Sequence, residues 1–191
     1  MSSFKETFDL VQVTPLLHFQ PETQGVCLRA SEVKPKLDKF IKAYLLRAGV
    51  DVAENLPHSW TDQEWDKKED RKATERVSFR YKMRFFVEGE PAIYQNYQRD
   101  AENNQIHPLY FAAMGRDAFQ NGTSRIKGVF YRQGLKMEVV CMAREVITLK
   151  DRTLTLLDLL KELIPPLFQF HCFGTRSGKG FGSFVVKERN A

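Results

Sequence analysis

The segment that organises this sequence lies close to its end and reads Gly174-Thr175-Arg176-Ser177-Gly178-Lys179-Gly180-Phe181-Gly182-Ser183-Phe184. Glycine adopts positive φ without strain, and successive N–H groups in such a turn form a concave site for an anion. The same glycines also suit an ordinary connection, so both interpretations stay open. There is no GxxxxGK[ST] loop, and strand residues follow instead of a helix, which argues against ATP or a dinucleotide. A phosphate polymer, meaning nucleic acid, is the better candidate ligand.

The elements on either side of this glycine-rich segment can be predicted. Residues 183–187 are expected to form a short final strand. Before the segment, Thr155 and Asp158 have the spacing of a capping box and open a helix over about 155–164. Its leucines predict a thoroughly buried side, and Pro165-Pro166 predicts its end.

A strand and a longer helix are expected in the first fifty residues. Residues 8–19 are β-branched and partly alternating, and Pro15 indicates an edge or a bend. The helix is expected to begin at a Ser31 cap, with Pro35 in its first turn, and to end at Gly49. Its apolar residues share one face at helical spacing, namely Val33, Leu37, Phe40, Ile41, Tyr44 and Leu45.

Residues 76–88 predict a half-buried strand because apolar and polar residues alternate strictly. One side of this strand carries Arg80, Lys82 and Arg84, which would form a basic stripe along a sheet face. Further on, residues 125–131 and 135–142 predict a hairpin that turns at 132–134.

The order of these elements is β-α-β-β-α-β, which predicts an α+β fold of the ferredoxin-like (RRM-like) kind. Two insertions interrupt this core, at about 51–75 and 90–123, and the first contains both tryptophans. We expect a single domain over residues 1–191. The fold alone does not define a function, because many functions share it.

Charge and composition limit the functional classes. The chain has a net charge of +5, but residues 51–75 hold eight acids and four bases, so the remainder is more basic than the total indicates. A basic body favours polyanionic partners. Three scattered cysteines indicate a reducing cytoplasm, and no metal site or cofactor is expected from their spacing. We find no signal peptide and no membrane-spanning run, so no membrane partner is expected.

One further pair of residues is a candidate for phosphate contacts. Ser31 and Lys34 stand at the start of the first predicted helix, where free N–H groups attract anions. A simple helix cap is the alternative interpretation of Ser31. Candidate catalytic residues are few, and His18 at the end of the first strand lacks an evident partner.

Two motifs together resemble the RAMP superfamily, the repeat-associated proteins of CRISPR–Cas effector complexes. Residues Leu28-Arg29-Ala30-Ser31-Glu32-Val33-Lys34-Pro35-Lys36-Leu37 resemble its SxLKGxL signature, with Pro35 where the family often has glycine. Residues 173–184 resemble its glycine-rich loop in the form RxxKGFGS. The order of elements and His107-Pro108-Leu109-Tyr110-Phe111 are similar to type III subunits of the Cmr or Csm kind.

The resemblance implies a non-catalytic RNA-binding subunit of a type III-like effector ribonucleoprotein that takes part in antiviral defence. Its partners would be single-stranded guide RNA and other effector subunits. Carried over by position, the residues that contact RNA phosphates are Ser31, Lys34, Arg176, Ser177 and Lys179, beside the stripe Arg80, Lys82 and Arg84. In related subunits that cut target RNA, an Asp follows the first strand, whereas here residues 20–25 offer only Glu22. The alternative is a metal-independent endoribonuclease that processes repeat RNA, with His18 as its catalytic residue.

Overall fold

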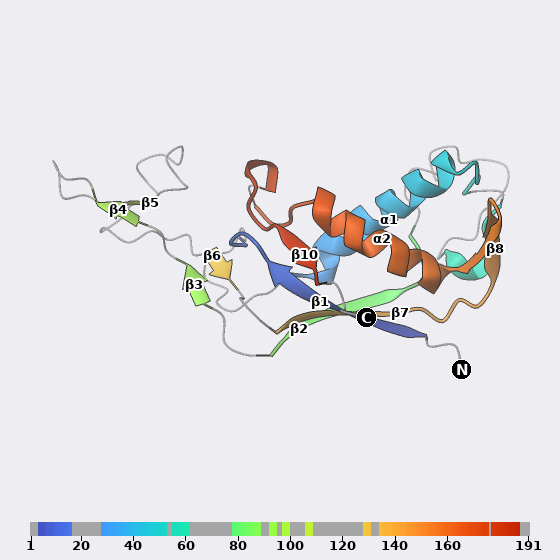
Figure 1. Cartoon of the computed structure of the whole chain (residues 1–191), viewed down its shortest axis with the longest axis horizontal. Coiled ribbons are helices and arrows are strands. Elements are labelled where there is room, and N and C mark those ends of the chain that lie inside the picture. The colour runs from blue at the N-terminus through green and yellow to red at the C-terminus, as the bar shows by residue number, and fades with distance from the viewer. Residues whose placement is uncertain are drawn as a thin grey trace.

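The fold is a four-stranded antiparallel sheet with two helices on one side (Figure 1). The computed structural model describes residues 4–16, 28–52, 55–61, 78–88, 134–175 and 177–187, and the backbone of 92–94, 97–99, 106–108 and 128–130. The sheet has the order β10-β1-β7-β2. Its elements are β1 (Lys5–Gln12), α1 (Ala30–Arg47), β2 (Lys82–Val87), β7 (Leu135–Val140), α2 (Leu156–Phe170) and β10 (Phe184–Val186). The protein is therefore α+β, and its topology is compatible with the predicted ferredoxin-like plan.

The core lies between the helices and the sheet, and the sequence periodicities explain it. Helix α1 buries Val33, Leu37, Ile41 and Leu45, four of the six residues of its predicted apolar face. Every second residue of β1 and β2 turns toward the helices, as alternation along a strand requires. The buried aliphatic and aromatic residues of the strands and both helices form one connected cluster.

The start of α1 differs from the prediction. The helix begins at Ala30, its N-cap is Arg29, and no side chain caps the first turn. The expected Ser31 cap is therefore wrong, since Ser31 already lies inside the helix and is exposed. Pro35 is the sixth residue of the helix and lies beyond the first turn in which it was expected, so its missing N–H costs one backbone hydrogen bond, to the Ser31 carbonyl.

Helix α2 also departs from its expected end. The capping box is confirmed, because the Thr155 hydroxyl accepts from the Asp158 N–H at 3.2 Å and the Asp158 carboxylate accepts from the Thr155 N–H at 3.1 Å. The helix does not stop at Pro165-Pro166 but continues to Phe170. Leu167 and Phe168 are buried in the core, so their burial compensates for the hydrogen bonds that the two prolines remove.

The predicted hairpin of residues 125–131 with 135–142 is wrong in its pairing. Strand β6 (Gly128–Phe130) pairs with β3 (Ala92–Tyr94), whereas β7 lies between β1 and β2. Val87 of β2 is paired with Leu135 of β7. The residue five positions after Val87 is Ala92 and the residue five positions before Leu135 is Phe130, and these two are paired as well. The β3–β6 pair thus keeps the register of β2 and β7, and the chain between 94 and 128 starts and ends at the tip of this ribbon.

The remaining elements are small. Strands β4 (Tyr97–Arg99) and β5 (Ile106–Pro108) pair with each other within the second predicted insertion. A hairpin of β8 (Val146–Leu149) and β9 (Arg152–Thr155), which was not predicted, connects β7 to α2. In the first insertion, η1 (His58–Trp60) buries Trp60, whose indole N–H donates to the Glu145 carbonyl at 2.9 Å. Trp60 therefore anchors this insertion to the domain, and Trp65 lies outside the described residues.

Candidate nucleic-acid interface

The side of the sheet away from the helices carries the predicted basic stripe. Arg80, Lys82 and Arg84 are exposed, while Phe79 and Tyr81, which alternate with them, are buried toward α1, so the predicted alternation is confirmed. The strand itself begins only at Lys82 and not at residue 76 as predicted, so Arg80 lies just before it. Lys5 of β1 and Lys82 of β2 are both level with Val140 of β7, between them. We call Lys5, Arg80, Lys82 and Arg84 the basic end of the sheet.

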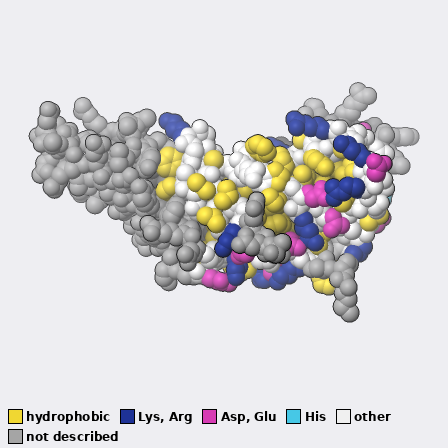
Figure 2. Space-filling model, viewed as in Figure 1, with side chains coloured by type: hydrophobic (Ala, Val, Ile, Leu, Met, Phe, Trp, Pro, Cys, Tyr) yellow, Lys and Arg dark blue, Asp and Glu magenta, His cyan; other side chains and the backbone are white. Residues whose placement is uncertain are grey.

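Acidic side chains interrupt this surface along the strands. Arg84 Nε donates to the Glu138 carboxylate at 2.6 Å, and Lys5 forms an ion pair with the same carboxylate. Further along β2, Lys136 pairs with Glu88 at 2.6 Å. Basic and acidic side chains accordingly lie together along the lower margin of the space-filling view, below the sheet (Figure 2). The excess of positive charge is confined to the basic end.

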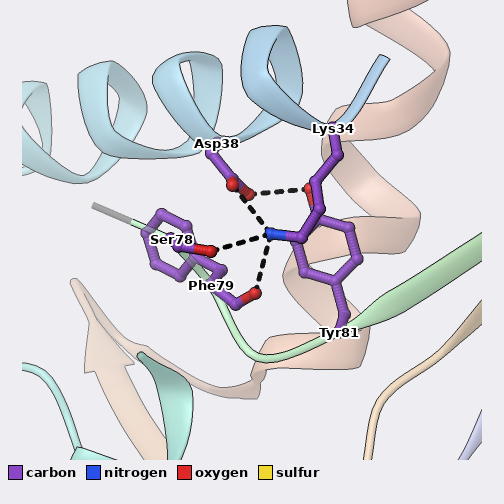
Figure 3. A network of polar contacts seen from close by, with 5 residues as sticks. All are labelled: Lys34, Asp38, Ser78, Phe79 and Tyr81. Atoms are coloured by element: carbon purple, nitrogen blue, oxygen red, sulfur yellow. Dashed lines mark hydrogen bonds and ion pairs between the residues drawn. The ribbon is translucent and has the colours of Figure 1, made fainter. Parts of the chain in front are cut away.

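Lys34, an expected phosphate ligand, lies in a network inside the domain (Figure 3). Its ammonium donates to Asp38 at 2.8 Å, to the Phe79 carbonyl at 2.9 Å and to the Ser78 hydroxyl at 3.2 Å. The same nitrogen lies 4.5 Å from the centre of the Tyr81 ring. An ammonium has three hydrogens, so these three acceptors use all of them. A phosphate would have to displace one of these acceptors, and a role in holding α1 to the segment before β2 is favoured.

The acid of this network is unusually placed. Asp38 also accepts a hydrogen bond from the Tyr81 hydroxyl at 2.8 Å. Burial raises the pKa of the Asp38 carboxyl above its ordinary value, although the hydrogen bond and charge of Lys34 act in the opposite direction. Burial and the Asp38 carboxylate likewise raise the pKa of the Tyr81 hydroxyl. The network is therefore an ion pair of Lys34 and Asp38 inside the domain, to which the Tyr81 hydroxyl also donates.

The backbone of the glycine-rich segment is attached to Thr14 and Pro15, which follow β1. The N–H of Gly182 donates to the Pro15 carbonyl at 2.9 Å, and that of Ser183 donates to the Thr14 hydroxyl at 2.9 Å. The Thr14 hydroxyl in turn donates to the Gly180 carbonyl at 2.6 Å. These two amides hold the segment in place and are not directed at a ligand. In this part the segment therefore acts as an ordinary connection and not as an anion site.

Side chains of the segment remain candidates for phosphate contact. Ser177 and Lys179 fall in the short helix η4 (Ser177–Lys179), where Lys179 is exposed. Lys36 of α1 lies against the start of the segment, donating to the Cys172 carbonyl at 2.6 Å and covering the Phe173 ring at 4.8 Å. The start of the segment is thus packed against α1 at Lys36. Arg176 lies outside the described residues.

The predicted contact residues divide into two groups at opposite ends of the sheet. Lys5 and Lys82 are level at one end, whereas the glycine-rich segment enters β10 next to Gln12 at the other. Seven residues of strand separate Lys5 from Gln12, which corresponds to about 23 Å. A single small anion cannot reach both groups, but a polymer of phosphates can.

Sequence reasoning missed several residues of this surface. Lys5 precedes the predicted first strand, although alternation with Thr7 and Asp9 was a usable signal. Arg144, whose guanidinium lies 4.9 Å from the Phe4 ring, adds a further base at the same end. Glu138 gave no signal, because its pairing with Lys5 and Arg84 follows from the order of the strands.

Catalytic and metal chemistry gain no support from the described residues. His18 and Glu22 lie outside them. His171, which is described, packs edge-on against Phe40. Within the described ranges no three His, Cys, Asp or Glu side chains gather as a metal site. Among the described helices, none combines the length and the hydropathy that a membrane span requires.

Comparison with known families identifies the chain. The family model "Cmr1 N-terminal domain" matches residues 3–191. The chain belongs to this family. Cmr1 is a RAMP-like family of type III CRISPR systems, so the resemblance found in the two motifs is confirmed. Membership implies a subunit of a type III CRISPR effector complex, with other effector subunits as partners. A search of curated protein sequences gives no match.

Proposed function

We propose that this Cmr1 domain is a non-catalytic RNA-binding subunit that holds the backbone phosphates of single-stranded guide RNA. The observation that carries the proposal is the basic end of the sheet. Lys82 and Arg84 are exposed on a sheet face that no described helix covers. Contacts between such side chains and phosphates give affinity without sequence preference.

The fold supports this function. We infer that the strand order β10-β1-β7-β2, with α1 after β1 and α2 between β7 and β10, is a ferredoxin-like core within one domain over residues 1–191. In such a core the face opposite the helices is available to a ligand. The distance of about 23 Å between the basic end and the glycine-rich segment suits an extended strand that touches both.

The proposed phosphate contacts are not all equivalent. Lys82, Arg84 and Arg80 serve at one end of the strand of RNA, and Ser177 and Lys179 serve at the other together with Arg176 and Ser31. Lys34 is proposed to act by fixing α1, since its three donors have protein acceptors. The ribbon of β3 and β6 would carry the second insertion toward neighbouring subunits or the RNA bases. The proposal places the complex in the cytoplasm.

A charge-matched pair of variants tests the proposal. Lys82→Gln with Arg84→Gln removes two charges from the basic end, and Lys39→Gln with Arg47→Gln removes two exposed charges from α1. Binding of a labelled single-stranded RNA is measured by filter retention at one salt concentration. We expect at least a tenfold loss for the first pair and less than a threefold loss for the second, from the share of phosphate contacts in affinity. Equal losses in both variants would contradict a localised interface.

A further inference from the structure

A nearly buried carboxylate lies in the middle of the exposed sheet face. Glu138 is on β7, a central strand, level with Thr7 on one side and Arg84 on the other. Its side chain is only 7% exposed, although its face carries no described helix. An acid placed beneath a phosphate-binding surface opposes that function electrostatically, so its position requires an explanation.

The two oxygens of Glu138 are divided between two cations. One oxygen accepts from Arg84 Nε at 2.6 Å, and the other is paired with the Lys5 ammonium. These cations are themselves exposed, Lys5 by 51% and Arg84 by 68%. The carboxylate therefore lies beneath them, and its burial results from the side chains that it holds. An ion pair that is shielded in this way restricts both partners to one geometry.

Arg84 is held at two points and keeps most of its donors. A guanidinium has five N–H groups, and the bond to Glu138 uses the one on Nε, which leaves four on the terminal nitrogens. Its central carbon lies 5.6 Å from the centre of the Phe86 ring, on the same side of β2. A guanidinium fixed at Nε, resting on a ring and still largely exposed, presents its terminal N–H groups to solvent as a fork.

We propose that Glu138 is a positioning residue that fixes Arg84 by its Nε so that the terminal N–H groups bind an RNA phosphate in bidentate fashion. The inference rests on the proposed function and assigns the geometry of one contact within it. Arginine matches a phosphate with two parallel hydrogen bonds, and fixing it beforehand removes the loss of side-chain freedom from the cost of binding. The donors of a lysine all lie on one nitrogen, so a contact with Glu138 would compete with a contact to phosphate, and no planar fork would be left for the phosphate.

The proposal can be tested because a positioning role and a purely electrostatic role of Glu138 predict opposite changes in RNA affinity when its charge is removed. Glu138→Gln removes a negative charge, which alone would strengthen RNA binding. If Glu138 positions Arg84, the variant instead binds labelled single-stranded RNA about threefold to tenfold more weakly. Glu88→Gln is the matched control, since Glu88 pairs with Lys136 on the same side and its loss changes the charge equally. Affinity of the control is expected to stay the same or to increase.

A second background adds a result that a purely structural role does not predict. In an Arg84→Lys chain the ammonium is shared between Glu138 and phosphate, so Glu138→Gln should release it and strengthen binding. The positioning role is supported if Glu138→Gln weakens RNA binding in the otherwise unchanged chain and strengthens it in the Arg84→Lys chain. Tighter binding by Glu138→Gln in the otherwise unchanged chain, or the same effect in both backgrounds, overturns it.

A loss of RNA binding counts only in a variant that folds. Far-ultraviolet circular dichroism and a thermal melt establish that each variant folds. If Glu138→Gln does not fold, Glu138→Asp takes its place, because it keeps the negative charge but shortens the side chain that reaches Arg84 Nε. We expect binding at least twofold weaker, and unchanged binding overturns the inference. If the unaltered chain does not bind RNA, the proposed function fails. If the unaltered chain binds RNA, and Arg84→Gln weakens this binding while Glu138→Gln does not, the proposed function stands and only the positioning role of Glu138 fails.

Discussion

Replacing Lys34 with methionine should destabilise the domain strongly, although one quarter of this side chain is exposed. The substitution keeps most of the side-chain length but removes the donor to Asp38, the Phe79 carbonyl and Ser78. Asp38, which is 9% exposed, would keep the hydrogen bonds from the Tyr81 hydroxyl and the Phe79 backbone but lose its only cationic partner in the network. Removing one partner of a buried ion pair costs about 3–5 kcal/mol.

The partial exposure of Lys34, 26%, places the expected loss near about 3 kcal/mol, the lower end of that range. For a chain of this size, such a loss lowers the melting temperature by roughly 6–12 °C. Unfolding in urea, followed by tryptophan fluorescence from the buried Trp60, measures it. Lys39→Met on the exposed side of α1 is the control and should change stability by less than about 0.5 kcal/mol.

A double variant and a binding measurement complete this test. Because Lys34 and Asp38 are in contact, Lys34→Met should cost less in an Asp38→Asn chain, with a coupling of about 0.5–3 kcal/mol. Well below the melting temperature, the folded Lys34→Met chain should keep the salt dependence of RNA binding of the unaltered chain. A loss of stability below about 1 kcal/mol, or equal to that of Lys39→Met, would refute the reasoning.

Three other predictions test the fold. Thr155→Ala removes the capping box of α2 and should cost about 1 kcal/mol in urea unfolding, and a neutral result would contradict the role of the cap. Gly182→Ala should cost more than about 2 kcal/mol, because φ is +68° and the new Cβ would lie 3.0 Å from Leu16 Cδ1 and collide with the Phe173 carbonyl, whereas Gly178→Ala has open space and should be nearly neutral. Asp38 has a raised pKa in the folded chain, so its contribution to stability is full below about pH 4 and is lost as the pH rises through that pKa. The cost of Asp38→Asn in urea unfolding should therefore fall as the pH rises above about 4, and a cost that increases with pH would contradict a raised pKa of Asp38.

The sequence predicted the elements better than their connections. Alternation located β2, and helical spacing located α1, because both patterns depend on residues close in sequence. The end of α2 was missed because local proline chemistry was outweighed by burial of Leu167 and Phe168. The β8–β9 hairpin turns at Lys150, which has φ of 54°, and it lacks the glycine that usually marks such a turn.

The candidate interface was predictable in part for the same reason. Lys82 and Arg84 were found because they alternate with apolar residues within one strand. Glu138 and Lys5 become relevant only when β7 lies between β1 and β2, which local patterns do not encode. Lys34 was assigned to RNA by its place in a motif, whereas its acceptors Ser78 and Phe79 are more than forty residues away in sequence.

The salt dependence of RNA binding tests the central claim most directly. The logarithm of the association constant for single-stranded RNA is measured against the logarithm of salt concentration, for the unaltered chain and for Lys82→Gln with Arg84→Gln. Each phosphate contact contributes a slope of about −0.7, so at least three contacts predict a slope of about −2 or steeper and a decrease in its magnitude of about 1.4 in the variant. A slope near zero, or the same slope in both chains, would contradict binding of the RNA backbone at the basic end of the sheet.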